Sequence, residues 1–205
     1  KSKIQNENAE FFPRSPYACA KLFAHFITKN YRESYGIYAC SGILFNHESP
    51  IRGEEFVTRK ITKSLSEIKV GKRNILELGN LNIKRDWGFA KDYVEAMWLI
   101  LQQKKPEDFV ISTNKSYSIK DFVNEAAKNL GFKIKWINKG KHEKGINLAN
   151  NKLIIKVNPK FYRPTDVFNL KGSYSKALKK LKWYPKTNFK KLVKIMVLED
   201  LKRVQ

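Results

Sequence analysis

The sequence predicts an α/β fold built around a parallel sheet, and three features carry this prediction. An amphipathic helix is expected to begin after Ser15 and to end at Gly36. A short, almost wholly apolar run follows at 37–45, which is typical of a strand buried on both faces of a parallel sheet. Helical and extended segments then alternate to the C-terminus, and a helix followed by such a strand is half of a βαβ unit.

The first helix carries a residue pattern that can do chemistry. Ser15 is a suitable N-cap, and Pro16 suits the first helical position, where its missing N–H costs nothing. Tyr17 and Lys21 lie four residues apart, so both project from one face. A lysine ammonium near a phenol lowers the phenol pKa, and such a tyrosine can accept a proton from a substrate hydroxyl. An exposed pair on an ordinary amphipathic helix remains the alternative.

The segment after the first strand predicts a ligand-binding loop. Residues 46–53 follow the carboxyl end of the strand, which is where open α/β sheets bind their ligands. The loop offers an amide, an imidazole, a carboxylate and a guanidinium, from Asn46, His47, Glu48 and Arg52. This concentration of polar groups favours a binding role for His47 over a satisfied surface residue.

A second helix is expected over 54–70, because apolar residues recur at helical spacing and Gly71 can end it. Near its N-terminus, Thr58, Arg59 and Lys60 either meet an anionic ligand or form a solvated basic face.

A third helix, over 90–103, shows an apolar stripe that we expect to pack on the core. The stripe consists of Tyr93, Val94, Met97, Trp98 and Leu101. A capping box of Ser118 and Asp121 predicts the start of a fourth helix, which ends at Gly131. Apolar runs predict strands over 75–78, 108–112, 133–137 and 153–157, and the polar stretch 138–151 predicts a loop. Closing helices are expected over 175–181 and 188–204.

Two further segments carry groups suited to an anion. Arg85 offers a planar fork for phosphate oxygens. Arg163 and Asp166 stand three residues apart around a proline, as would suit a phosphate together with a ribose diol or a base N–H. A surface ion pair is the alternative for this second segment.

Composition narrows the possible partners. The net charge of +22 could indicate nucleic-acid binding, but the lysines are dispersed without a dense basic tract or a nucleic-acid motif, so we expect no nucleic acid. No apolar run reaches membrane-spanning length, so no membrane partner is expected. Cys19 and Cys40 are interpreted as reduced, buried thiols of a cytoplasmic protein.

Several motifs together match one family. They are Tyr17-x-x-x-Lys21, Gly-Ile-Leu-Phe-Asn-His-Glu-Ser-Pro at 42–50, Phe-Val-Thr-Arg-Lys-Ile at 56–61, Arg-Asp-Trp-Gly at 85–88 and Tyr-Arg-Pro-Thr at 162–165. With these motifs the chain resembles the carboxyl-terminal portion of the GDP-mannose 4,6-dehydratases, in the extended short-chain dehydrogenase/reductase superfamily. The resemblance implies the end of a Rossmann-type doubly wound parallel sheet at 1–45. It implies a smaller α/β substrate-binding domain mainly at 46–205, with segments returning to the sheet.

The resemblance also implies roles for individual residues. Tyr17 and Lys21 would be catalytic and would both bind the cofactor: Tyr17 would be the catalytic tyrosine, and Lys21 would hold the NADP ribose and lower the tyrosine pKa. His47 and Arg52 would complete the NADP pocket. The GDP-mannose side would be lined by Asn46, Val57, Lys60, Gly79, Arg85, Arg163 and Asp166. No metal site is implied.

The implied enzyme is a lyase. It would convert GDP-mannose to GDP-4-dehydro-6-deoxy-mannose by NADP-mediated intramolecular hydride transfer and loss of water, working as a homo-dimer or tetramer. The family's Gly-rich phosphate turn and its Ser/Thr and Glu catalytic groups lie upstream of the Tyr-Lys helix, and this chain has no such turn. We therefore expect a fragment that needs the missing N-terminal half and is inactive alone.

Three positions depart from the family pattern, and two other functions stay open. Ile51 stands where an arginine is usual, Phe89 where a histidine is usual and Asp166 where a glutamate is usual. The nearer alternative is another NAD(P)-dependent sugar-nucleotide dehydratase or epimerase. The remoter alternative is a basic nucleic-acid-binding module.

Overall fold

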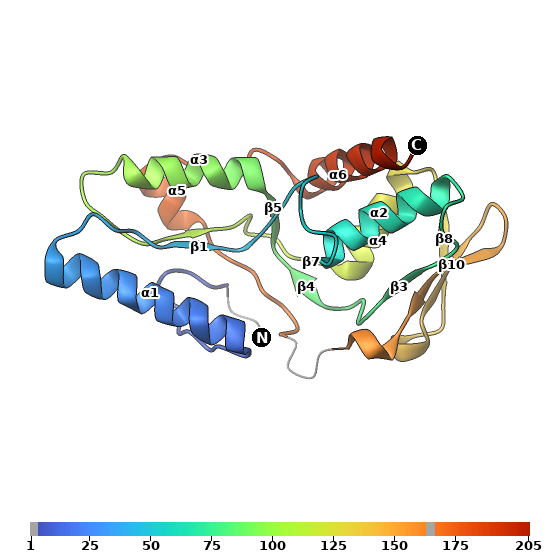
Figure 1. The fold of residues 1–205 in the computed structure, drawn as a ribbon, viewed down its shortest axis with the longest axis horizontal. Helices are drawn as coiled ribbons and strands as arrows, with labels where there is room; N and C mark the ends of the chain where they lie inside the picture. Colours follow the sequence, from blue (N-terminus) through green and yellow to red (C-terminus); the bar gives the residue numbers. More distant parts are fainter. Residues whose placement is uncertain (1–3, 163–166) are drawn as a thin grey trace. The chain divides into compact units, whose positions relative to one another are not determined.

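The computed structural model describes residues 4–162 and 167–205, and the chain divides into two compact units. Unit 1 is formed by Lys1–His47, Arg85–Ser116 and Thr165–Thr187. Unit 2 is formed by Glu48–Lys84, Tyr117–Pro164 and Asn188–Gln205. The chain therefore passes back and forth between the units, and each unit is assembled from segments far apart in the sequence (Figure 1).

Unit 1 is built on a parallel pair of strands. Its elements are α1 (Pro16–Tyr35), β1 (Gly42–Leu44), β2 (Asn46–Glu48, whose last residue belongs to unit 2), β5 (Trp87–Phe89), α3 (Ala90–Leu101), β6 (Phe109–Ile111) and α5 (Ser175–Leu181). β1 pairs with β6 in parallel, with Gly42 opposite Phe109 and Leu44 opposite Ile111. Figure 1 shows this small sheet between α1 on one side and α3 on the other. This is the layering of a parallel α/β fold.

The start and end of α1 follow from local chemistry. The Ser15 side chain accepts a hydrogen bond from the Ala18 N–H at 3.1 Å. Pro16 occupies the first turn, and Gly36 ends the helix with φ of 65°, a left-handed conformation that glycine adopts without strain. The predicted helix is confirmed.

The first strand is shorter and less buried than expected. Only Gly42–Leu44 is extended, whereas 37–45 was predicted. Gly42 is exposed, and Ile37 and Tyr38 are 47% and 41% exposed, so burial on both faces is wrong here. Among the described residues β1 pairs only with β6, and no strand lies along its other edge.

The apolar stripe expected to bury α3 lies largely in solvent. Tyr93 is fully buried, but Val94, Met97, Trp98 and Leu101 are 40–62% exposed. The core face of α3 consists instead of Tyr93, Ala96 and Ile100. These side chains pack with β6 and α5 in a cluster completed by Phe109, Ile111, Ala177, Leu181 and Trp183.

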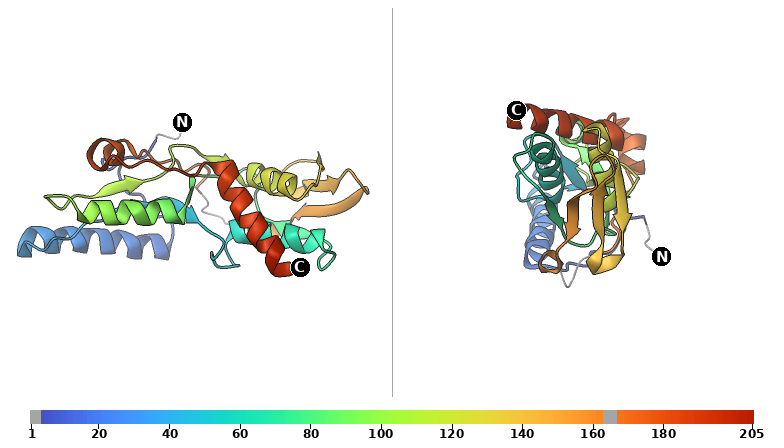
Figure 2. Two further views of the ribbon diagram at one scale, coloured as in Figure 1. Left: turned by 90° about the horizontal axis from the view of Figure 1, so that it is seen from above. Right: turned by 90° about the vertical axis from the view of Figure 1, so that its right-hand side faces the viewer.

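In the described part of the chain, unit 2 combines a mixed sheet with three α-helices. Its main elements are α2 (Val57–Lys69), β3 (Leu76–Leu78), α4 (Ile119–Asn129), β8 (Ile134–Ile137), β9 (Lys144–Asn147), β10 (Lys152–Val157) and α6 (Phe189–Val204). Shorter elements are β4 (Lys84–Arg85, whose last residue belongs to unit 1), β7 (Tyr117–Ser118), η1 (Gly140–His142) and η2 (Pro159–Phe161). The sheet order is β3-β10-β9-β8, with β3 parallel to β10 and the other pairs antiparallel. In Figure 2, α2, α4 and α6 lie together beside this sheet.

One expected loop proves to be a strand. The stretch 138–151 contains η1 and β9, so its prediction as a loop is wrong. The sequence pattern did not predict β9 because its inward-facing position is occupied by Gly145, which has no side chain. A Cβ at Gly145 would lie 3.1 Å from Ile134 Cγ2 and 3.2 Å from Ile155 Cβ, so glycine lets the neighbouring strands close over it.

The predicted capping box of α4 is confirmed. The Ser118 hydroxyl accepts from the Asp121 N–H at 3.0 Å, and the Asp121 carboxylate accepts from the Ser118 N–H at 2.8 Å. α4 then packs against α2 and α6 through Phe122, Val123 and Ala126, which are fully buried. Within the described ranges, no helix combines the length and apolar character needed to cross a membrane.

Candidate functional site

The Tyr-Lys pair lies on an uncovered helix. Tyr17 is in the first turn of α1 and is 74% exposed, and Lys21 one turn later is also exposed. No residue of α1 is buried. The phenol and the amine are therefore accessible to solvent. The residues of α1 do not form the walls of a crevice around them.

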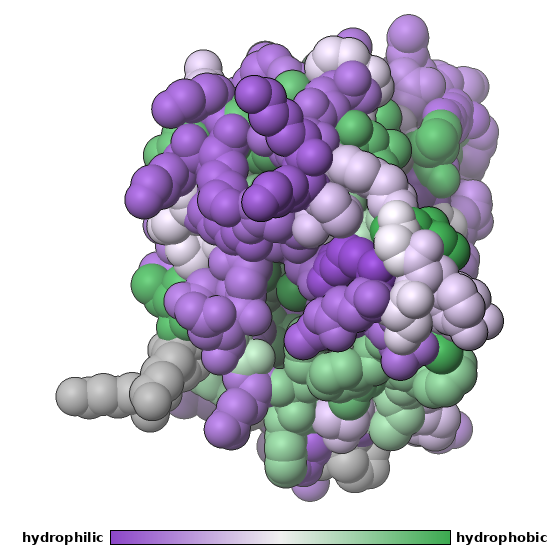
Figure 3. Space-filling model, turned by 90° about the vertical axis from the view of Figure 1, so that its left-hand side faces the viewer, coloured by the Kyte–Doolittle hydropathy of each residue, from purple (hydrophilic) through white to green (hydrophobic). Residues whose placement is uncertain are grey.

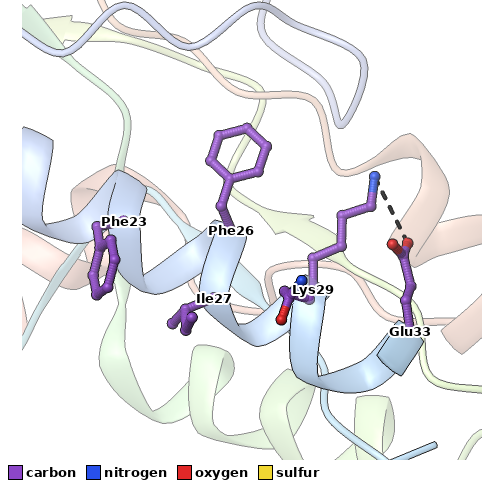
Figure 4. Close-up of a pocket in the computed structure, with 6 residues that line it drawn as sticks. Phe23, Phe26, Ile27, Lys29 and Glu33 are labelled. Carbon is purple, nitrogen blue, oxygen red and sulfur yellow. Dashed lines mark ion pairs between the residues drawn. The ribbon is translucent and has the colours of Figure 1, made fainter. Parts of the chain in front are cut away.

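A hollow on α1 lies further along the helix. It is lined by Phe23, Phe26, Ile27, Lys29, Asn30 and Glu33, with Lys29 and Glu33 forming an ion pair across one turn (Figure 4). All of these residues belong to one helix, whereas ligand sites take their walls from several elements. The hollow is thus the surface of an unpacked helix rather than a binding site.

The apolar character of this surface extends along α1. Phe23 is 69% exposed and Phe26 is 52% exposed. Figure 3 shows hydrophobic side chains gathered in the lower part of one face, at the level of α1 in Figure 1, below a mostly hydrophilic region. Cys19 is exposed on the same helix, so the expectation of a buried thiol is wrong there, while Cys40 is half-buried.

The histidine of the predicted loop lies in a strand. Asn46 and His47 begin β2, which pairs with β5, so this part of 46–53 is not a loop. His47 Nδ1 lies 3.1 Å from the Phe45 carbonyl oxygen, and its ring centroid is 5.6 Å from that of Tyr93. The carbonyl favours a proton on Nδ1, which leaves Nε2 as the acceptor nitrogen. The strand thus holds the imidazole in a defined orientation.

Arg52 is held at the turn that follows. Its guanidinium carbon lies 3.6 Å from the centre of the Phe56 ring, and its Nε lies 3.5 Å from Glu48 Oε2. Glu48 is 2% exposed and accepts a hydrogen bond from the Thr58 hydroxyl at 2.6 Å. Burial raises the Glu48 pKa, while Thr58 and Arg52 oppose that rise by stabilising the carboxylate.

Two residues expected near an anionic ligand, Thr58 and Arg59, are buried in the protein interior. Thr58 is 1% exposed and Arg59 is 6% exposed, so neither forms a solvated basic face. Arg59 donates to Asp200 of α6 and to backbone carbonyls of the turn. Contact of Thr58 and Arg59 with a ligand is therefore not supported. Arg59 instead connects α2 to α6 and to the turn before α2.

Lys60 and Gly79 meet at Phe161. Lys60 Nζ lies 3.8 Å from the centre of the Phe161 ring, and burial lowers the Lys60 pKa. A Cβ at Gly79 would lie 2.5 Å from the Phe161 carbonyl oxygen, so only glycine fits at this approach. Val57, the first residue of α2, is half-buried. Unit 2 thus brings two of its predicted substrate residues to one aromatic side chain.

The remaining predicted residues divide between unit 1 and the undescribed positions. Arg85 Nη1 donates to the Val167 carbonyl oxygen at 2.6 Å, and both residues belong to unit 1. Arg163 and Asp166 lie outside the described residues. Within 4–162 and 167–205, no three His, Cys, Asp or Glu side chains gather in a way that could hold a metal ion.

With this geometry established, the chain can be compared with known proteins. A family model described as GDP-mannose 4,6 dehydratase matches residues 1–196. The chain belongs to this family. A GDP-mannose 4,6 dehydratase of Dictyostelium discoideum is 52% identical over 201 residues, covering 98% of this chain and 56% of that protein. One of Drosophila melanogaster is 51% identical over 197 residues, covering 96% of this chain and 50% of that protein.

The chain thus spans about half the length of the curated relatives it matches. Among solved structures, RMD from Pseudomonas aeruginosa complexed with NADPH has a TM-score of 0.79 at 19% identity, covering 98% of this chain and 60% of that one. A dTDP-glucose 4,6-dehydratase from Bacillus anthracis in complex with NAD also has a TM-score of 0.79 at 19% identity, covering 98% of this chain and 57% of that one. These likenesses confirm the expected fold class, an α/β fold with a Rossmann-type parallel sheet.

Sequence reasoning missed the acidic partners of Arg52 and Arg59, which are Glu48 and Asp200. Glu48 was recognised only as one polar group of a loop, and Asp200 was not singled out. An acid within an otherwise apolar helical stripe was the available signal for Asp200, since a buried carboxylate requires a partner.

Proposed function

We propose that the protein to which this chain contributes is a GDP-mannose 4,6-dehydratase. It is an NADP-dependent lyase that converts GDP-mannose to GDP-4-dehydro-6-deoxy-mannose. The observation that carries this proposal is about 50% identity to enzymes of that name across nearly the whole chain. We further propose that it works in the cytoplasm as a homo-dimer or tetramer.

Three residues carry groups that suit the nicotinamide cofactor. Arg52 supplies a guanidinium for a phosphate, stacked on Phe56 in a fixed turn. His47 offers an oriented imidazole, and Tyr17 has an exposed hydroxyl. The cofactor, when bound, supplies the acceptor and later the donor of the hydride.

The chain's own groups then handle the proton and the orientation of the ligands. Tyr17 accepts the proton of the mannosyl C4 hydroxyl at its phenolic oxygen, and Lys21 holds the ribose. Asn46, Val57, Lys60, Gly79 and Arg85, with Arg163 and Asp166, bind the GDP-mannose side. Phe161 orients Lys60 for this role through its ring.

Unit 1 exposes one edge of its sheet and apolar faces of two helices. β1 pairs only with β6 among the described residues, and the apolar faces of α1 and α3 lie in solvent on either side of that pair. Exposed apolar patches of this kind are typical of surfaces that are covered by another segment or partner. We propose that the half of the relatives that this chain does not match adds strands beside β1 and covers both helices.

The test is activity with and without that half. The 205-residue chain alone is expected to show no NADP-dependent loss of GDP-mannose, measured by chromatography of the sugar nucleotides. Joined to the matching N-terminal half of the Dictyostelium relative, it is expected to form the 4-dehydro-6-deoxy product. Turnover by the isolated chain would refute the need for a second half. Epimerisation without dehydration in the joined protein would favour the epimerase alternative.

A further inference from the structure

One buried arginine holds the turn at 49–53 from inside unit 2. Arg59 Nη1 donates to the carbonyl oxygens of Pro50 at 2.7 Å and of Arg52 at 3.0 Å. Arg59 is 6% exposed, so these bonds compete little with water. The exposed Arg203 of α6 adds a second donor to the Pro50 carbonyl at 2.6 Å.

Arg59 is in turn fixed by α6. Its Nε donates to both carboxylate oxygens of Asp200, at 2.8 and 3.0 Å. The Thr62 hydroxyl donates to the same carboxylate at 2.6 Å, and Asp200 is 1% exposed. The four hydrogen bonds of its guanidinium leave Arg59 a single orientation, which directs its Nη1 at the turn.

Stability alone does not account for this pair. Apolar side chains of similar volume often replace a buried ion pair without loss of stability, because the charges must first be removed from water. What apolar side chains cannot supply is the pair of donated bonds to the turn. The feature that needs Arg59 is therefore the conformation of 49–53.

That conformation determines where Arg52 points. The Arg52 carbonyl is one of the two oxygens that Arg59 holds, so the backbone that carries the Arg52 side chain is tied directly to Arg59. Glu48 and Phe56 then restrain the side chain itself. Pre-organisation of this kind lowers the cost of ordering a binding group when its ligand arrives.

We propose that the Arg59–Asp200 pair is a positioning device, which presets the guanidinium of Arg52 for an anionic group of the cofactor without touching that group. The role of Arg52 rests on the proposed function, whereas the restraint on the turn does not. α6 thereby contributes to a cofactor site although it presents no residue to it.

The decisive variant removes the pair without leaving a lone buried charge. Arg59→Met combined with Asp200→Leu keeps the interior filled, and the Thr62 hydroxyl retains acceptors at the Thr58 and Arg59 carbonyls. Lys63→Ala, which removes the ion pair between this α2 residue and Glu54 just before the helix, is the control.

Limited trypsin digestion of the 205-residue chain tests the conformation of the turn at 49–53 without any cofactor. We expect the Arg52–Gly53 bond to be cut about tenfold faster in the double variant, relative to the other lysine and arginine sites, because two buried hydrogen bonds no longer oppose local opening. The urea midpoint should stay near that of wild type. Cleavage at Arg52 no faster than in Lys63→Ala, or a uniform rise at all sites, would overturn the proposal.

Equilibrium dialysis of NADP+ tests the link to the ligand, with the same variants placed in the protein joined to the N-terminal half of the Dictyostelium relative. The double variant should bind about tenfold more weakly than wild type, and it should cause no further loss when Arg52→Ala is already present, because the effect passes through Arg52. Equal binding by wild type and the double variant, or a loss that persists without Arg52, would refute positioning. If wild type binds no NADP+, the cofactor proposal fails for this chain, and the tryptic pattern alone decides whether Arg59 holds the turn.

Discussion

Arg32 near the end of α1 donates to both carboxylate oxygens of Asp108, at 2.7 and 3.0 Å. The same carboxylate accepts from the Ser41 N–H at 2.7 Å, and Arg32 also donates to the Ala39 carbonyl at 3.0 Å. This network joins the helix that carries Tyr17 to the segments that enter β1 and β6. It is a principal polar attachment of a helix that has no buried residue.

Asp108→Asn should destabilise unit 1. The substitution removes the charge that pairs with Arg32, and both side chains are largely buried, at 15% and 17% exposure. Hydrogen bonds to charged groups contribute about 1.5–3 kcal/mol, so a loss of about 2 kcal/mol is expected in urea unfolding followed by circular dichroism. Glu33→Gln, which removes an exposed helix pair with Lys29, is the control and should change little. Equal midpoints for both variants would contradict the attachment.

The same pair predicts a pH dependence. Burial acts to raise the Asp108 pKa, but the bonds from Arg32 and the Ser41 N–H outweigh it and hold the pKa below its usual value. Because the folded pKa lies below the unfolded value of about 3.9, the stabilisation is complete above that pH and is lost as pH falls through the folded pKa. The stability difference between wild type and Asp108→Asn should therefore be constant above about pH 5 and shrink below about pH 4. A difference that grows on acidification would contradict this sign.

Gly79→Ala should disturb the place where Lys60 and Phe161 meet. The added Cβ would lie 2.5 Å from the Phe161 carbonyl oxygen, so the backbone of η2 must shift. Overpacking of this kind costs about 1–3 kcal/mol, which thermal unfolding would detect. Gly71→Ala is a useful contrast, since a Cβ there meets nothing within 4 Å and its cost comes only from the positive φ. A wild-type melting temperature for Gly79→Ala would show that the approach is not tight.

Tyr17→Phe should abolish turnover in the protein completed by its other half. Loss of a general base typically lowers kcat by about 10²- to 10⁴-fold. Tyr31→Phe, an exposed tyrosine on the same helix, is the control for the loss of a hydroxyl. Full activity of Tyr17→Phe would remove Tyr17 from the mechanism.

Trp98→Lys should distinguish the folding of unit 1 from its association with the other half of the protein. Trp98 is 62% exposed, so the charge is tolerated in the isolated chain and should reduce its aggregation, measured by light scattering. If the other half covers α3, the same change should weaken association of the two halves by about tenfold or more, because a lysine would be buried without a partner. Lys91→Ala near the start of α3 serves as the comparison. Unchanged association of Trp98→Lys would place the other half elsewhere.

Sequence patterns predicted those features correctly that depend on interactions between neighbouring residues. The N-cap at Ser15, the stop at Gly36 and the capping box at Ser118 each depend on atoms within a few residues, and each was confirmed. The strand β9 was missed because a glycine between two strands leaves no apolar pattern to read. The buried face of α3 was misassigned because both faces are apolar, and only the packing against Trp183 and α5 distinguishes them.

The sequence by itself determined the family, most of the helices and strands, and the residue types available for chemistry, since these follow from motifs and short-range propensities. Only the tertiary structure decided which of those residues face a ligand and which serve the fold. Arg59 and Asp200 are 141 positions apart, and no local pattern can indicate that a basic residue at a helix start will be buried against an acid of the last helix. Burial and ion pairing depend on which distant segments meet in space, so they belong to the folded chain and not to any stretch of it.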